Sequence, residues 1–178
     1  MPAYHSTCCL LLIATLLSAP AARADSAVEV RAMLARGDSA GALDRAAAAA
    51  AADPGNASTR FLLGVVLMEM LRGEEALQVF SLLSQEFPEL PDPYNNIALL
   101  HARAGRLELA RQSLESALRS DPGHRTARSN LGQVHLMLAV QAWEQAAADG
   151  PLDAAVMRRL QGARLLLAAP GLSPPGAR

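Results

Sequence analysis

One sequence pattern recurs along this chain at a constant interval of about 34 residues, and it limits the possible folds more than any other feature. Three prolines have this spacing: Pro54, Pro88 and Pro122. Three alanines have it as well: Ala42, Ala76 and Ala110. A third set consists of small residues: Gly64, Ala98 and Gly132. Because a period of this length is typical of helical solenoids, the pattern predicts stacked helix pairs, each of which packs on its neighbours.

The composition supports an all-α fold and argues against several classes of protein. The chain has 178 residues, of which 51% are hydrophobic and only 3% aromatic. Alanine and leucine favour helices, whereas the β-branched and aromatic residues that favour strands are sparse. A formal net charge of −1 lacks the electrostatic pattern of a nucleic-acid binder, and so few aromatics make a base-stacking surface implausible. We therefore expect no nucleic-acid partner.

Two units match a known helical repeat at most of its characteristic positions. The unit 57–90 matches with Leu63, Gly64, Ala76, Phe80 and Pro88. The unit 91–124 matches with Tyr94, Ile97, Ala98, Ala110, Leu114, Ala117 and Pro122. A weaker unit before them matches with Gly37, Ala42, Ala46, Ala49 and Pro54. In these residues the chain resembles the tetratricopeptide repeat (TPR) family. The resemblance implies a right-handed superhelix of antiparallel helix pairs with a C-terminal capping helix.

We expect a TPR domain over residues 25–168, with units at about 25–56, 57–90 and 91–124, a shortened unit at 125–153 and a cap at 154–168. The expected helices are 26–36, 39–52, 57–71, 74–86, 92–104, 107–119, 125–148 and 152–168. The unit that begins at Arg125 has no Gly, Asp, Asn or Pro between Leu136 and Glu144. Its second-helix pattern nevertheless reappears five residues early, at Ala139, Trp143, Ala146 and Pro151. This indicates a deletion at the turn, and predicts either one continuous helix over 125–148 or a cramped turn near 139–140.

The segment 1–24 has the pattern of a secretory signal peptide. An apolar run at 8–17 is too short to span a bilayer and is followed by small residues, which predicts cleavage after Ala24. An uncleaved anchor is the alternative. Cleavage would remove Cys8 and Cys9, leave no disulfide, and give a periplasmic or secreted protein that is not an integral membrane protein. The Pro- and Gly-containing tail at 169–178 is expected to be disordered.

Catalytic chemistry has no pattern to support it, and we expect neither an enzyme nor a cofactor. The sequence contains no nucleophile motif, phosphate-binding loop or HExxH motif. His101 and His135 occupy the same repeat position, where the family usually has tyrosine. They are either a metal-binding pair or substitutes for tyrosine between helices, and no carboxylate or thiol pattern joins them. His124 follows a turn and is expected to be solvated.

The resemblance to the TPR family places a binding groove on the concave side, lined by the first helix of each unit. The candidate groove residues are Phe61, Val65, Met68, Asn95, Leu99, Arg103, Ser129, Gln133 and Leu136. Some of them could instead pack against the N-terminal unit or the cap. Family members that clamp a C-terminal carboxylate use Lys and Asn where this chain has Phe61 and Val65, and lysine is absent from the sequence. An apolar or helical peptide segment is therefore the expected ligand.

These features predict an exported bacterial TPR protein of the Gram-negative cell envelope. Its expected role is that of a non-catalytic adaptor or scaffold that binds a protein segment in its concave groove. One alternative is a structural envelope protein that self-associates as a weak homodimer. Another is a metal-binding protein that uses its histidines.

Overall fold

The computed structural model describes residues 19–168, which form eight helices and contain no strand. The first four are α1 (Ala19–Ala35), α2 (Ser39–Ala52), α3 (Ala57–Glu69) and α4 (Gly73–Glu86). They are followed by α5 (Pro91–Arg103), α6 (Leu107–Ser120), α7 (Arg125–Asp149) and α8 (Ala154–Ala168). The all-α prediction is confirmed. Within residues 19–168, no helix combines the length and the apolar character needed to cross a bilayer.

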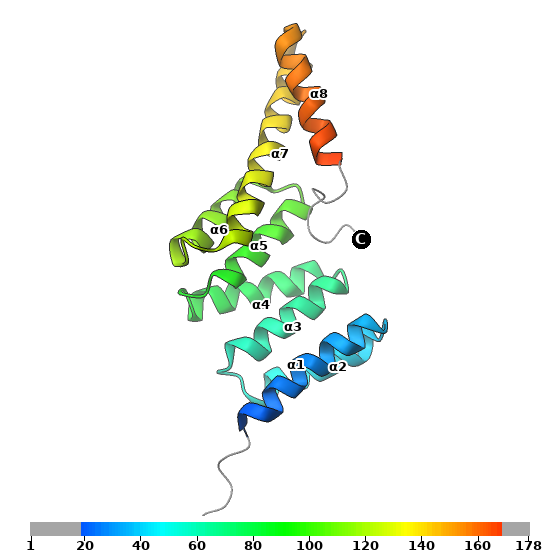
Figure 1. Ribbon diagram of the computed structural model, residues 1–178, viewed down its shortest axis with the longest axis vertical. Helices are drawn as coiled ribbons and strands as arrows, with labels where there is room; N and C mark the ends of the chain where they lie inside the picture. The colour runs from blue at the N-terminus through cyan, green and yellow to red at the C-terminus, as the bar shows by residue number, and fades with distance from the viewer. Residues whose placement is uncertain (1–18, 169–178) are drawn as a thin grey trace, which may run out of the picture.

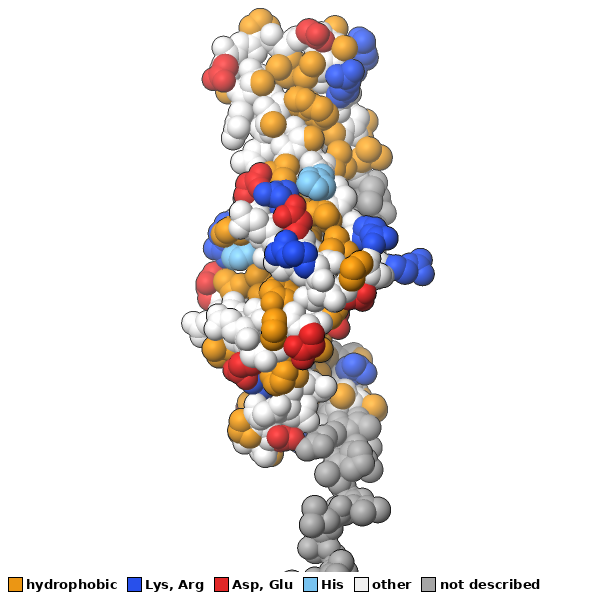
Figure 2. Space-filling model, turned by 90° about the vertical axis from the view of Figure 1, so that its left-hand side faces the viewer, with side chains coloured by type: hydrophobic (Ala, Val, Ile, Leu, Met, Phe, Trp, Pro, Cys, Tyr) orange, Lys and Arg blue, Asp and Glu red, His pale blue; other side chains and the backbone are white. Residues whose placement is uncertain are grey.

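The helices stack as successive antiparallel pairs along one long axis, which is vertical in both Figure 1 and Figure 2. The pair α1–α2 lies at one end, and the pair α7–α8 lies at the other. Each helix packs on the next one in the chain, and the first helices of neighbouring pairs also meet, α1 with α3 and α5 with α7. The first helices therefore line one side of the stack, which is where a groove was expected.

The turns inside the first three pairs repeat one backbone conformation. Gly37, Leu71 and Gly105 all have positive φ, at 79°, 59° and 72°, and they occupy equivalent positions in successive repeats. Glycine adopts this left-handed conformation at little steric cost, whereas leucine does so rarely. The expected helix at 57–71 ends at Glu69, because the turn that leads to Leu71 has already begun.

Inside each unit the two helices meet through residues of complementary size. Gly64 on α3 faces Phe80 on α4 so closely that a Cβ atom at Gly64 would lie 2.6 Å from Cε1 of the ring. The equivalent residues are Val30 with Ala46 in the first unit and Ala98 with Leu114 in the third, and these four are at most 1% exposed. A small residue on one helix is thus matched by a large one on the other, which lets the two helices pack closely.

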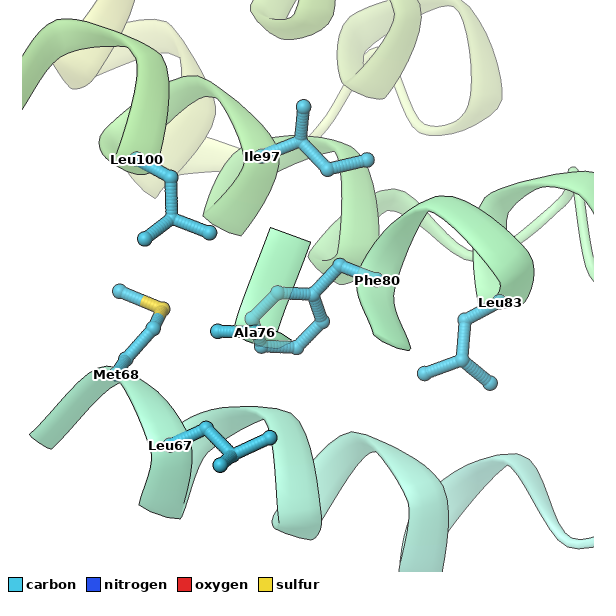
Figure 3. Close-up of a cluster of buried hydrophobic side chains, with 7 residues drawn as sticks. All are labelled: Leu67, Met68, Ala76, Phe80, Leu83, Ile97 and Leu100. Atoms are coloured by element: carbon cyan, nitrogen blue, oxygen red, sulfur yellow. The ribbon is translucent and has the colours of Figure 1, made fainter. Parts of the chain in front are cut away.

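Phe80 lies at the centre of a hydrophobic cluster that joins α3, α4 and α5. Figure 3 shows its ring among side chains from three successive helices. The cluster consists of Leu67, Met68, Ala76, Phe80, Leu83, Ile97 and Leu100. Further clusters join α1 to α3, α5 to α7, and α7 to α8, so the core is a chain of local clusters along the stack.

The shortened unit forms one continuous helix, as one of the two alternatives predicted. The 25-residue α7 extends beyond the stack, and α8 lies beside its distal half (Figure 1). Leu160 and Ala163 of α8 pack on Val140 of α7 in a small separate cluster. We call the distal half of α7 (residues 139–149) together with α8 the arm.

The main difference from the expected helix limits lies at the N-terminus. Helix α1 begins at Ala19 instead of residue 26, and it runs without a break through Ala24, the predicted cleavage site. Alanine is the best helix former, and Pro20 is tolerated because it stands in the first turn. The rest of the predicted signal peptide and the predicted disordered tail lie outside the described residues.

Candidate binding cleft

A cleft of about 370 Å³ opens where the first helices of three successive units meet. Helix α1 contributes Ala27, Arg31 and Leu34. Helix α3 contributes Ala57, Ser58, Phe61, Leu62 and Val65, and the start of α5 contributes Asp92 and Pro93. Its surface is mainly apolar, with a few polar groups, which is the usual character of a ligand-binding pocket.

The α3 wall owes its position to a capped helix start and a packed aromatic ring. The Asn56 side chain caps α3 by accepting a hydrogen bond from the Ser58 backbone amide at 3.0 Å. The following turns place Ser58, Phe61 and Val65 on one face. The ring of Phe61 packs at an angle of 57° on that of Phe80, with centroids 5.3 Å apart. Phe61 therefore presents a fixed apolar surface to the cleft.

The α5 wall is tied to the next unit through a histidine. Nε2 of His124 lies 3.0 Å from Oδ1 of Asp92, and its Nδ1 accepts a hydrogen bond from the Ala127 backbone amide at 3.0 Å. The expectation that His124 is a solvated turn residue is wrong, because the ring caps α7 and is largely buried. This contact holds Asp92 at the edge of the cleft, while Arg31 supplies a basic group on the α1 side.

The structure separates the predicted groove residues into different environments. Phe61 and Val65 line the cleft. Met68 is only 7% exposed, and Figure 3 shows it pointing into the core near Leu100. Asn95 is 6% exposed, and its Oδ1 accepts a hydrogen bond from Nδ2 of Asn130 at 2.8 Å. Both residues are structural in this arrangement, because the next first helix covers them.

The remaining predicted residues do not continue the cleft. Leu99 and Gln133 line a second hollow of only about 10 Å³ between α5 and α7. Arg103 is half-buried, Ser129 is exposed, and Leu136 packs against the α7–α8 cluster. The small residues between α5 and α7 let these helices approach closely, so no open groove remains there.

The contribution of α1 to the cleft was not predicted from the sequence, although the repeat spacing indicates it. Ala27, Arg31 and Leu34 precede Phe61, Val65 and Met68 by one repeat period. They therefore hold the same repeat positions in the first unit. The weaker match of that unit to the repeat pattern concealed its contribution.

The two histidines that share a repeat position have different surroundings. Nδ1 of His101 accepts a hydrogen bond from Nε of Arg106 at 3.0 Å, and burial together with the Arg106 charge lowers the pKa of the ring. His135 is exposed on α7. Among the described residues no group of three or more His, Cys, Asp or Glu side chains could hold a metal ion.

Comparison with known protein families gives the same family for two successive parts of the stack. Two family models, both described as tetratricopeptide repeat, match residues 33–97 and 95–148. A search of the curated proteins found no match to the sequence.

Solved structures with the same arrangement of helices share little sequence with the chain. The first TPR of Spaghetti (RPAP3), bound to HSP90 peptide SRMEEVD, aligns with a TM-score of 0.58 at 17% identity, over 65% of this chain and 92% of that one. MamA aligns with a TM-score of 0.56 at 18% identity, over 76% of this chain and 82% of that one. The P58(IPK) TPR domain aligns with a TM-score of 0.60 at 20% identity, over 82% of this chain and 41% of that one.

Proposed function

The chain belongs to the tetratricopeptide-repeat family, and we propose that it is a non-catalytic scaffold that binds a protein segment in the cleft between α1, α3 and α5. The observation that carries the proposal is the cleft itself, which holds about 370 Å³ and is lined by three successive units. A preformed apolar cleft reduces the ordering cost of binding, because its walls need not be rebuilt around the ligand.

The chemistry of the walls favours an apolar segment over an acidic one. Phe61 and Val65 face the cleft at the repeat positions where carboxylate-clamping relatives use Lys and Asn. The RPAP3 domain, which was solved with the HSP90 peptide SRMEEVD, shares only 17% of its residues with this chain. We infer that this cleft takes one or two apolar side chains of a partner, with Arg31 and Asp92 orienting the partner's backbone or polar groups.

We further propose that the protein acts in the periplasm of a Gram-negative bacterium. The support is the apolar run at 8–17 followed by small residues up to Ala24. Mass spectrometry of the protein purified from the envelope fraction of a Gram-negative host tests this. A mature N-terminus at Asp25 supports export, whereas an intact Met1 in the cytoplasmic fraction contradicts it.

The binding proposal is tested with peptides selected from a random library on the immobilised protein. The affinity of a selected apolar peptide is then measured by calorimetry for the wild type, Val65→Asp and Leu82→Asp. Val65 lines the cleft, whereas Leu82 is 51% exposed on α4 and does not line it, so Leu82→Asp is the matched control. We expect Val65→Asp to weaken binding at least about tenfold, because it places an unpaired charge against an apolar ligand.

Two outcomes would contradict the proposal. One is equal affinity of the wild type and Val65→Asp, with the helical circular dichroism of both unchanged. The other is selection of acidic C-terminal peptides such as SRMEEVD in place of apolar ones, which would indicate a clamp that the sequence does not predict.

A further inference from the structure

The fourth unit has second-helix residues that do not pack on its own first helix. In complete units the corresponding residues are fully buried: Phe80 and Leu83 are 0% exposed, and Leu114 and Ala117 are 1% and 0% exposed. Trp143 and Ala146 hold the same positions in the fourth unit once the five-residue deletion is counted. Trp143 is half-buried and Ala146 is exposed, because α7 continues straight instead of folding back.

The first half of α7 has an exposed face at the position where its partner helix would pack. Gly64 and Ala98 are buried under the second helix of their units. Gly132 holds the same repeat position, yet it is exposed and a Cβ atom added there would have nothing within 4 Å. Arg128 and His135 lie on the same stripe of α7 and are exposed as well.

The connection between these two halves is too short for them to pair within one chain. Three residues join the helices of each complete unit, at 36–38, 70–72 and 104–106. The fourth unit has lost five residues, and its helix continues without a turn. When a hinge is too short to close, the same contact is readily made with a second copy of the chain.

We propose that two copies of this chain form a dimer by exchanging the distal halves of α7, so that residues 139–149 of each copy complete the fourth unit of the other. The two α7 helices run antiparallel, with the two-fold axis between Met137 and Leu138. The occupant of the exposed Gly132 face is therefore the same element that the other units use, supplied in trans.

In the exchanged dimer a large residue on one helix meets a small residue on the other, as it does between the two helices of each complete unit. In this register Trp143 of one copy lies on Gly132 of the other, as Phe80 lies on Gly64. The largest side chain at this repeat position thus meets the smallest residue. The half-buried state of Trp143 fits as well, because one side packs on the α7–α8 cluster while the other is open to a partner.

The pairing is also complementary in charge. In the second unit Arg60 pairs with Glu86 and donates a hydrogen bond from Nη2 to Oε1 at 2.8 Å. Arg128 holds the repeat position of Arg60, and Asp149 holds that of Glu86 after the deletion. Within one chain, α7 carries these two residues near its opposite ends. In the exchanged dimer, Arg128 of each copy meets Asp149 of the other.

The test is sedimentation equilibrium of the full-length chain between about 1 and 100 µM, a range in which an exchanged dimer of ordinary affinity dissociates. We expect a monomer–dimer equilibrium for the wild type. Gly132→Leu should raise the dimer dissociation constant by about 100-fold, because its side chain blocks the Trp143 site. In the monomer the same side chain points into open space and improves helix propensity, so the helical circular dichroism should be unchanged. Gly162→Leu, at another open helical site, is the matched control and should dimerise like the wild type.

The charge pair between Arg128 and Asp149 provides a second, independent test of the dimer. Arg128→Asp should weaken the dimer about tenfold, and the double variant Arg128→Asp with Asp149→Arg should restore it.

A wild type that stays monomeric at about 100 µM overturns the proposal, and so does a Gly132→Leu protein that dimerises like the wild type. A monomer with fully buried Trp143, the only tryptophan in the chain, would mean that the arm folds back on its own unit, and this result also overturns it. Because the cleft lies at the opposite end of the stack, peptide affinity in these variants tests the proposed function separately.

Discussion

Replacing Gly64 by alanine should destabilise the protein, although alanine is the better helix former. In an open helix the exchange of Gly for Ala gains about 0.5–1 kcal/mol. At Gly64 the new methyl group would lie 2.6 Å from Cε1 and 2.7 Å from Cζ of Phe80, far inside the roughly 3.5–4.0 Å of a normal carbon contact. The ring is 0% exposed and packs on Phe61, so it has no free space to enter. Overpacking of this kind costs about 1–3 kcal/mol, which leaves a net loss of about 1 kcal/mol.

A double-mutant cycle separates this mechanism from a general loss of stability. Phe80→Leu alone should cost about 1–2 kcal/mol, because it leaves a cavity under Gly64. The double variant Gly64→Ala with Phe80→Leu recreates the pair Ala98 and Leu114, which is at most 1% exposed in the next unit. The two losses should therefore not add, and we expect a favourable coupling free energy of about 1 kcal/mol or more.

The assay is urea unfolding followed by far-ultraviolet circular dichroism, with equal m values required for comparison. Gly162→Ala is the control, since its added Cβ atom meets nothing within 4 Å, and it should gain about 0.5–1 kcal/mol. A Gly64→Ala protein as stable as the wild type would refute the reasoning. So would a double variant whose loss equals the sum of the two single losses.

Two further predictions concern histidines. His124→Ala removes the cap on the Ala127 amide and the contact with Asp92, and it should lower the free energy of unfolding by about 1 kcal/mol in the same assay. Burial and the nearby Arg106 charge lower the pKa of His101 in the folded protein. The contribution of His101 to the free energy of unfolding is therefore complete above the usual histidine pKa and is lost as the pH falls. Stability should thus decline as the pH falls below the usual histidine pKa of about 6.5. His101→Gln should flatten that decline, and an equally steep decline in the variant would contradict the assignment.

The sequence predicted the helices well because the repeat pattern records which residues pack inside a unit. Gly64, Ala76 and Phe80 mark the close contact of α3 with α4, and Pro88 marks where the next unit begins. The continuous α7 was one of two predicted alternatives, and it formed because no residue between Leu136 and Glu144 interrupts a helix.

The candidate site was harder to predict, because it depends on the distance between units. The burial of Met68 and Asn95 follows from how closely α5 approaches its neighbours, which the repeat period does not encode. His124 was misjudged for a similar reason, since its partner Asp92 comes from the start of the preceding helix pair, far away in the sequence. The α1 wall required a comparison with a unit whose own pattern is weak. The predicted signal peptide and periplasmic location remain predictions.

The cleft has a mechanical consequence, because none of the three units that line it forms the cleft alone. Helices α1, α3 and α5 belong to separate pairs, and each pair is held mainly by its immediate neighbours. The distance between the walls is therefore set by the curvature of the stack, which in solenoids follows from the small rotation between successive repeats. A bound segment would fix three pairs at one curvature and stiffen that end of the molecule. Conversely, tension that straightens the stack would spread the walls and release the segment, so that affinity would depend on load.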